Sequence, residues 1–198
     1  DLVQHYISCG TIWVHGHSEA VPTSEEAPRR PFGDYGVKKA KMEAFLLDAT
    51  RRHGFPATSI HPGHIVGRGW PPLNPEGHFD RRVWFALRDG KDIVLPNLGL
   101  ETVHHVHADD VAQLFVKAMH NWSCAVGESF HAVSPQALTL RGYAEAAYRW
   151  FDHEPALRFS PWEKRKSELS ETDARYVWDH IAHSPCCSIA KAQKLLDY

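Results

Sequence analysis

The stretch GDYGVKKAKMEAF, residues 33–45, places Tyr35 and Lys39 four residues apart at the start of an amphipathic helical pattern. Residues i and i+4 of a helix lie on one face, with Cβ atoms about 5–6 Å apart. A nearby ammonium group favours the phenolate and lowers the pKa of a tyrosine, so Tyr35 could serve as a general acid or base toward an alcohol or carbonyl. The other interpretation is that both are ordinary surface residues of the helix.

The same helix carries apolar residues on two sides. One stripe consists of Val37, Ala40, Ala44 and Leu47. Met42 and Leu46 lie on the side of the tyrosine and the lysine, roughly opposite this stripe. We therefore expect the helix to be buried on two sides, one facing a sheet and the other facing a site or a second subunit.

Strand and helix patterns alternate on both sides of this helix. Residues 5–16 (HYISCGTIWVHG) and 55–67 (FPATSIHPGHIVG) are apolar and rich in β-branched residues, which predicts two buried strands. Proline-rich segments at 17–34 and 68–80 predict long loops. The helix itself is expected to run from Tyr35 to about His53 and to end at Gly54.

The second half of the chain continues the alternation. It predicts strands at 92–97, 101–107 and 127–133 and helices at 81–90, 110–121, 139–151, 170–183 and 188–196. Asp109 or Asp110 is placed to cap the helix that follows it. Such alternation predicts an α/β fold with a largely parallel sheet and helices on both faces, followed by a more irregular lobe.

Composition excludes several classes of partner. With 198 residues and 43% hydrophobic residues, the chain is long enough for a buried core. The 22 basic and 24 acidic residues give a net charge of -2, which disfavours nucleic acid and anionic membranes as partners. No apolar run approaches the roughly 20 residues of a membrane span. The four cysteines match neither a disulfide framework nor a CxxC pair, which predicts reduced thiols in a cytoplasmic protein.

Histidine is abundant, with 15 residues, so a metal site has to be considered. In the densest group a strand would place His105 and His107 on one face and His104 on the other. Two ligands on one face need a third, and no HExxH or similar companion is present in the sequence. We therefore predict ordinary strand histidines and no metal.

These segments, in this order, resemble the extended short-chain dehydrogenase/reductase family, which includes NAD-dependent epimerases, dehydratases and reductases. The stretch ISCGTIWVHG is similar to the family strand that ends in a serine or threonine, with Thr11 at the hydroxyl position, and YGVKK resembles the catalytic tyrosine and lysine. Four later segments also resemble family segments, the last of them with Asp197 in place of a glycine: HPGHIVG, VHHVHADDVAQLF, GESFHAVSPQALTL and SIAKAQKLLDY.

The resemblance implies three catalytic roles. Thr11 would hydrogen-bond the reacting oxygen, and Tyr35 would transfer its proton. Lys39 would tune Tyr35 and, with it, bind the ribose of a nicotinamide cofactor, NAD or NADP, which carries the hydride.

It also implies which residues surround these three. Pro62 and Gly63 would lie near the nicotinamide. Trp13 and His64 would face the substrate, although a packed strand end and a core histidine are the alternative interpretations.

The family's glycine-rich turn, which seats the cofactor's pyrophosphate, is not found in this sequence. The chain begins at what resembles the family's fifth strand, which predicts a fragment or the product of a broken gene. By the resemblance, the fold is the C-terminal part of a Rossmann-like doubly wound sheet plus a smaller α+β substrate-binding lobe. Residues 1–69 would form the second half of the dinucleotide-binding domain. Residues 70–198 would form mainly the lobe, with 108–134 returning to the core.

Two departures from the family pattern bear on the substrate. Dehydratases of this kind carry an Asp-Glu pair after the threonine, where this chain has Ile12 and Trp13; Val103 stands where many nucleotide-sugar enzymes place an arginine. We therefore predict an NAD(P)-dependent oxidoreductase acting on a carbonyl or secondary alcohol of a small molecule. A nucleotide-sugar epimerase and a non-catalytic scaffold are the alternatives. The two-sided helix predicts a homodimer of the full-length protein.

Overall fold

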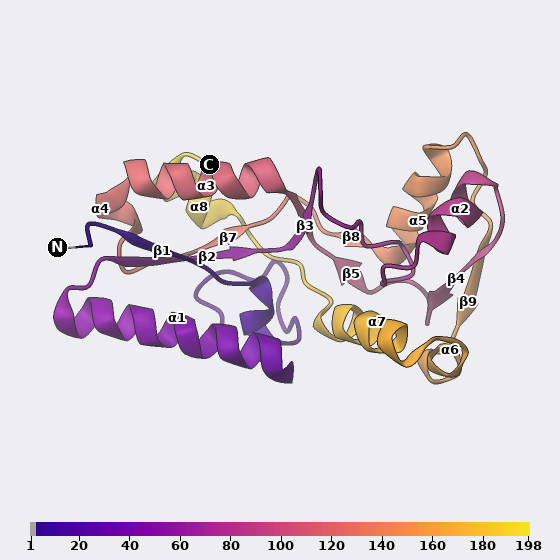
Figure 1. Cartoon of the computed structure of the whole chain (residues 1–198), viewed down its shortest axis with the longest axis horizontal. Helices are drawn as coiled ribbons and strands as arrows, with labels where there is room; N and C mark the ends of the chain where they lie inside the picture. Colours follow the sequence, from indigo (N-terminus) through magenta and orange to yellow (C-terminus); the bar gives the residue numbers. More distant parts are fainter. Residues whose placement is uncertain (1–2) are drawn as a thin grey trace. The chain divides into compact units, whose positions relative to one another are not determined.

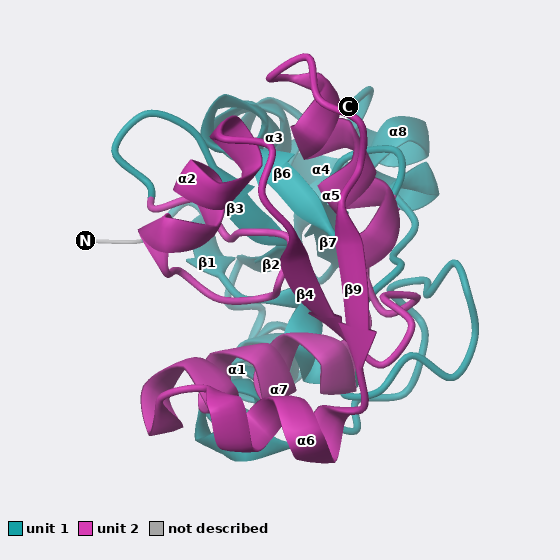
Figure 2. Cartoon of the chain, turned by 90° about the vertical axis from the view of Figure 1, so that its right-hand side faces the viewer, with its two compact units in different colours: residues 1–70, 104–136, 185–198 teal, residues 71–103, 137–184 magenta. Residues whose placement is uncertain are grey.

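A computed structural model of the chain describes residues 3–198. The chain divides into two compact units, which are coloured separately in Figure 2. Unit 1 contains the residues up to Trp70 together with 104–136 and 185–198, and unit 2 contains 71–103 and 137–184. The assignment of a cofactor-binding role and a substrate-binding role to parts of the chain stays a prediction.

A parallel three-stranded sheet forms the centre of unit 1. Its strands are β1 (Tyr6–Cys9), β2 (Ala57–Pro62) and β7 (Ser129–Ala132), in the order β1-β2-β7. Helix α1 (Gly33–His53) lies on one side of the sheet, and α3 (Ala108–His120) and α8 (Ala190–Leu196) lie on the other (Figure 1). The short helix α4 (Trp122–Ala125) follows α3. The predicted α/β fold with helices on both faces of a parallel sheet is confirmed.

The two faces of this sheet differ in chemistry, because successive strand residues point to opposite sides. On the α3 and α8 side, Ile60 and Phe130 pack into a fully buried core with Leu114 of α3 and Leu196 of α8. The alternate positions of β2 and β7 are polar and equally buried; they are Ser59, His61, Ser129 and His131. The face under α1 therefore buries hydrogen-bonding groups that have to be satisfied within the protein.

The first predicted strand is too long. Strand β1 ends at Cys9, and Ile12–His15 form a single turn of 3₁₀ helix, η1, whose N-cap is Thr11. The Thr11 side chain accepts a hydrogen bond from the Trp13 amide, which gives the backbone an alternative to the strand ladder. Thr11 thus lies just beyond the carboxyl end of β1 rather than within a strand.

The second predicted strand is broken at Gly63. After β2, the chain enters β3 (His64–Val66), which pairs in parallel with β6 (His105–His107) in a separate two-stranded sheet. A Cβ atom at residue 63 would lie 2.3 Å from the carbonyl oxygen of His104. The glycine is therefore required where the two backbones approach each other.

Helix α1 begins two residues before the predicted start and ends as expected, with Gly54 in the left-handed conformation at φ 65°. Its buried residues are Gly36, Glu43 and Leu46. Ala44 is exposed, and Phe45 is 72% exposed. Within residues 3–198 of this chain only the face of α1 toward the sheet is covered, so the predicted burial of the other side against a site or a second subunit stays a prediction.

Two histidines, rather than the predicted aspartates, determine where α3 and the strands before it begin and end. The predicted strand 101–107 splits into β5 (Thr102–Val103) and β6 at the buried His104. The predicted cap at Asp109 or Asp110 is wrong, because His107 is the N-cap and its ring accepts a hydrogen bond from the Asp109 amide. Both aspartates lie in the first turn, where a negative charge favours the helix dipole.

Unit 2 combines two small sheets with four helices. Strands β4 (Ile93–Pro96) and β9 (Leu157–Ser160) pair in parallel, and β5 pairs antiparallel with β8 (Leu138–Thr139). The helices are α2 (Arg81–Arg88), α5 (Leu140–Arg149), α6 (Trp162–Glu168) and α7 (Glu171–His183). Strand β9 and helix α6 were not predicted. None of the helices formed by residues 3–198 has the length and apolar character needed to cross a bilayer.

Candidate active site

Thr11 is held from two directions at the end of β1. Thr11 is 7% exposed, and its backbone amide donates a hydrogen bond to Nδ1 of His61 over 3.1 Å. Its hydroxyl oxygen accepts from the Trp13 amide over 3.3 Å, and its side chain lies close enough to the phenol of Tyr35 to act on the pKa of that phenol. The structure thus brings together two of the residues predicted to be catalytic.

Tyr35 and Lys39 lie on one side of the first turns of α1, as their spacing predicts. The Lys39 ammonium lies 5.8 Å from the centroid of the Tyr35 ring and donates a 2.7 Å hydrogen bond to the carbonyl oxygen of Cys9. Tyr35 is 52% exposed. Thr11, Tyr35 and Lys39 therefore converge at the carboxyl end of β1, where the open edge of a parallel sheet commonly binds ligands.

The electrostatic effect predicted for Lys39 is not found in this structure. The pKa of Tyr35 is raised rather than lowered, because partial burial of the phenol and the nearby Cys9 thiol outweigh the hydrogen bond from Thr11. The Lys39 ammonium is instead engaged with the Cys9 carbonyl. Among the neighbours of Tyr35 in residues 3–198, only Thr11 acts to lower its pKa, and its effect is smaller than the rise caused by burial and Cys9.

The residues predicted to surround the catalytic three take different positions. The Trp13 ring packs edge-on against Tyr35, with the centroids 6.0 Å apart. Pro62 ends β2, and the Gly63 amide donates to the carbonyl of Ala132. His64 begins β3 and packs edge-on against His105 at 5.4 Å. Trp13 therefore adjoins the predicted catalytic group, whereas Gly63 and His64 have packing contacts that account for their presence.

A buried ionic network, which the sequence reasoning missed, lies under helix α1. Glu43, 3% exposed, accepts hydrogen bonds from Arg29 Nε (3.0 Å) and Nη2 (2.6 Å), from the Ser129 hydroxyl (2.6 Å) and from His61 Nε2 (2.9 Å). Burial alone would raise the pKa of Glu43, but His61 and Arg29 together hold it well below its usual range. A signal was present, because Glu43 follows Lys39 by one helical turn and His61 interrupts an apolar strand.

Two further histidines lie buried beside this network. His15 Nε2 and His131 Nε2 are 2.8 Å apart, and the His131 amide donates to Glu25 over 2.9 Å. Burial lowers the pKa of His15 to about 4, with Arg29 and His61 adding to the effect. It also lowers the pKa of His131, with the other two histidines adding to the effect. Both rings are thus neutral near pH 7. Among residues 3–198, histidines, cysteines and acidic residues form no group of three that could hold a metal ion.

Mild acid is expected to destabilise the fold. The unfolded chain protonates His15 near pH 6.5, whereas the folded chain resists protonation down to about pH 4, so the free energy of unfolding decreases as the pH falls through this window. His15 alone accounts for about 2 kcal/mol at pH 5, and His131 acts in the same direction. Urea unfolding at pH 7.5, 6 and 5 measures the effect. Equal free energies at pH 7.5 and 5 would contradict it.

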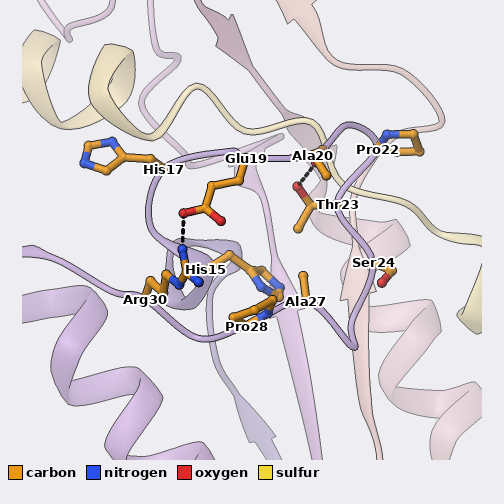
Figure 3. A pocket seen from close by; sticks show the side chains of 10 residues that line it. All are labelled: His15, His17, Glu19, Ala20, Pro22, Thr23, Ser24, Ala27, Pro28 and Arg30. Atoms are coloured by element: carbon orange, nitrogen blue, oxygen red, sulfur yellow. Dashed lines mark hydrogen bonds and ion pairs between the residues drawn. The ribbon is translucent and has the colours of Figure 1, made fainter.

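A cavity of about 170 Å³ lies within unit 1, under the loop between η1 and α1 (Figure 3). Glu19 and Arg30, two of its lining residues, form an ion pair, and the Thr23 hydroxyl donates to the Ala20 carbonyl. The lining residues are His15, His17, Glu19, Ala20, Pro22, Thr23, Ser24, Ala27, Pro28 and Arg30. None of the predicted catalytic residues is among them, so this cavity is not the candidate active site.

The donor groups at the end of β1 fit a nicotinamide cofactor. The partly exposed ammonium of Lys39 uses one of its three hydrogen-bond donors on Cys9, and the exposed phenol of Tyr35 lies beside it. An ammonium and a phenol together can bind two neighbouring hydroxyl groups of a ribose. The residues present are therefore compatible with the predicted cofactor contact of Tyr35 and Lys39.

Comparison with known proteins finds one matching family and two curated relatives. The profile of the NAD dependent epimerase/dehydratase family matches residues 2–131. The chain is 30% identical over 146 residues to the chloroplast stem-loop binding protein of 41 kDa b from Arabidopsis thaliana, covering 73% of this chain and 35% of that protein. It is 30% identical over 118 residues to UDP-glucose 4-epimerase from Mycolicibacterium smegmatis, covering 59% of this chain and 36% of that enzyme.

A solved structure extends the likeness to nearly the whole chain. UDP-glucuronic acid 4-epimerase from Bacillus cereus, in complex with UDP-glucuronic acid and NAD, superposes with a TM-score of 0.71 at 16% identity. The match covers 98% of this chain and 56% of the enzyme. The chain therefore spans about a third of the length of the two curated relatives and little more than half of this structural neighbour.

Proposed function

Because the chain belongs to the NAD dependent epimerase/dehydratase family, we propose that it carries the acid–base half of an oxidoreductase active site. Its substrate is a small molecule with a carbonyl or secondary alcohol, and its cofactor is NAD or NADP. The observation that supports this most directly is the convergence of Thr11, Tyr35 and Lys39 at the carboxyl end of β1. Pro62 and Gly63 on the cofactor side and Trp13 and His64 on the substrate side complete the proposal.

The roles follow from the contacts of each side chain. The Thr11 hydroxyl and the Tyr35 phenol, which lie beside each other, both bind the oxygen of the substrate. Tyr35 gives its proton to that oxygen during reduction and takes it back during oxidation. The Lys39 ammonium lies 5.8 Å from the centre of the Tyr35 ring and favours the phenolate once its hydrogen bond to the Cys9 carbonyl is released. When bound, the nicotinamide supplies the hydride chemistry.

A nucleotide-sugar epimerase is the second candidate. It is favoured by the 30% identity to a UDP-glucose 4-epimerase, and it needs no acid beyond the same three residues. Val103, at the position where the resemblance leads one to expect an arginine, is 2% exposed in the core of unit 2 and offers no charge to a diphosphate. We therefore place the epimerase after the oxidoreductase.

A binding function without catalysis is the third candidate. It is favoured by the 30% identity to a protein named for binding stem-loops. The net charge of -2 argues against nucleic acid as a partner. Fluorescence anisotropy with a labelled stem-loop RNA tests this candidate directly. Saturable binding that weakens with salt would support it.

Cofactor binding is the experiment that tests the oxidoreductase proposal. We would titrate NAD and NADP by calorimetry into this chain and into a version extended upstream through a glycine-rich strand and turn. We expect binding by the extended version, followed by turnover in a screen of alcohols, ketones and UDP-sugars. A lack of cofactor binding by both versions would contradict the proposal and favour the third candidate.

The full-length protein is expected to form a homodimer through the outer face of α1. Phe45, 72% exposed, lies on that face, and burying a phenylalanine stabilises an interface by about 2 kcal/mol. We therefore expect Phe45→Glu to convert a dimer to a monomer, as measured by light scattering of the extended protein. The matched control is Asp48→Ala, an exposed residue of the same helix. A monomeric wild-type protein would refute the prediction.

The protein is expected to act in the cytoplasm, with no membrane partner. All four cysteines are unpaired, as expected for a reducing compartment: Cys9, Cys124, Cys186 and Cys187. Fractionation of cells expressing the protein tests this expectation. Recovery in the membrane fraction would contradict it.

A further inference from the structure

A buried hydrogen-bonded chain leads from α1 to the backbone of Thr11. Glu43 and His61 are 2.9 Å apart, and His61 Nδ1 is 3.1 Å from the Thr11 amide nitrogen. The His61 residue is completely buried. No role in proton transfer is assigned to either Glu43 or His61, since neither of them contacts Tyr35 or Lys39 through these bonds. Their contact with Thr11 is the one to be explained.

The geometry dictates which nitrogen of His61 carries the proton. A backbone amide can only donate, so Nδ1 must present a lone pair to the Thr11 amide. The remaining ring proton then resides on Nε2 and is donated to the Glu43 carboxylate. Neutral His61 is thus held as the Nε2–H tautomer, because the hydrogen bond made by one nitrogen fixes the state of the other.

Neighbouring residues fix both ends of this chain. Residue 10 has to be a glycine, because a Cβ atom there would lie 2.2 Å from His61 Nδ1. Arg29 contacts both carboxylate oxygens of Glu43, and the Ser129 hydroxyl contacts one of them. The carboxylate therefore has little freedom to turn away from the histidine ring.

Helix α1 carries Tyr35 and, through Glu43, also supports Thr11 at the end of β1. Tyr35 and Lys39 face the end of β1, and Glu43, one turn after Lys39, reaches the same strand end through His61. Resting on the proposed function, we propose that Glu43 and His61 are positioning residues, which hold the Thr11 backbone so that its hydroxyl stays beside Tyr35. A single rigid helix then sets the distance between the two groups that bind the reacting oxygen.

Two substitutions at His61 separate the two hydrogen bonds. The Asn Oδ1 atom is the same number of bonds from the backbone as Nδ1, so His61→Asn keeps an acceptor for the Thr11 amide and loses the contact with Glu43. The Gln Nε2 atom matches the ring Nε2, so His61→Gln keeps a donor for Glu43 and loses the acceptor for Thr11. A merely structural role predicts similar defects in both variants.

The first test uses this chain and does not depend on catalysis. Long-range ¹H–¹⁵N NMR at pH 7.5 is expected to find His61 as the Nε2–H tautomer. Hydrogen exchange of the Thr11 amide is expected to accelerate about tenfold in His61→Gln, the equivalent of one lost hydrogen bond, and by a clearly smaller factor in His61→Asn, which keeps the acceptor but loses the support of Glu43. The Thr23 amide, bonded to the Cys186 carbonyl, is the control for global opening. An Nδ1–H tautomer or equal exchange in both variants would overturn the proposal.

The second test uses the extended protein and a substrate found in the screen. We expect His61→Gln to lower kcat about tenfold or more with KM little changed, and His61→Asn to recover part of the loss, because it keeps the acceptor for Thr11 without the support of Glu43. Equal losses in both variants would refute positioning. If Tyr35→Phe leaves turnover unchanged, the proposed function fails, whereas the exchange result still decides whether His61 holds Thr11.

Discussion

Replacing Tyr35 with phenylalanine is expected to lower turnover of the extended protein by about 10²–10⁴-fold, the usual contribution of a positioned proton donor. The substitution removes the phenolic oxygen that lies beside the Thr11 side chain and keeps the ring that packs on Trp13. Because Tyr35 is half exposed, we expect the fold to be retained. The measurement is the steady-state rate of NAD(P)H formation or consumption with the substrate found in the screen.

The matched control for this variant is Tyr6→Phe. Tyr6 is also exposed, lies in β1 and packs on Phe55, so that its phenol is remote from Thr11 in the sheet register. It should turn over like the wild type. Unchanged turnover in Tyr35→Phe would show that the tyrosine–lysine spacing is only a feature of the helix surface, and would end the catalytic interpretation.

The elements that can be predicted from sequence are those whose ends are marked by a local residue signal, such as a glycine at the end of a helix. Gly54 in the left-handed conformation ends α1 where the pattern predicts, and the alternation of segments gives the α/β class. The family resemblance is confirmed by the profile match over residues 2–131. Local signals suffice here because a helix end depends on a few neighbouring backbone groups.

The errors occur where distant segments decide the structure. The strand at 55–67 breaks at Gly63 because β6, some 40 residues later, brings the His104 carbonyl against it. Strand β1 stops at Cys9 because the Thr11 amide bonds to a side chain of β2 instead of continuing the ladder. Neither partner can be recognised from the local pattern alone.

The candidate site shows the same division. The positions of Thr11, Tyr35 and Lys39 follow from motif and helical spacing, although their roles stay predictions. The direction of the Tyr35 pKa does not follow from spacing, because it depends on burial and on the Cys9 carbonyl that engages Lys39. A carboxylate such as Glu43 looks like a solvent-exposed helix residue until the polar face of the sheet is seen beneath it.

Removing that carboxylate should produce the largest loss of stability in unit 1. Glu43→Ala leaves the Arg29 guanidinium with no counter-ion and takes the acceptor from both His61 and Ser129. Breaking a buried pair in this way costs about 3–5 kcal/mol. We expect urea unfolding of this chain at pH 7.5 to show a decrease in the free energy of unfolding within that range.

The control and the conservative variant make this result interpretable. Asp48→Ala, on the same helix, removes an exposed pair with Arg52 and should cost less than about 0.5 kcal/mol. Glu43→Gln keeps an oxygen that accepts from His61 or Ser129, so it should retain part of the stability lost in Glu43→Ala. If Glu43→Ala costs no more than Asp48→Ala, the network does not stabilise the fold. The burial of the Glu43 carboxylate would then be explained only by its contact with His61, which in turn holds Thr11.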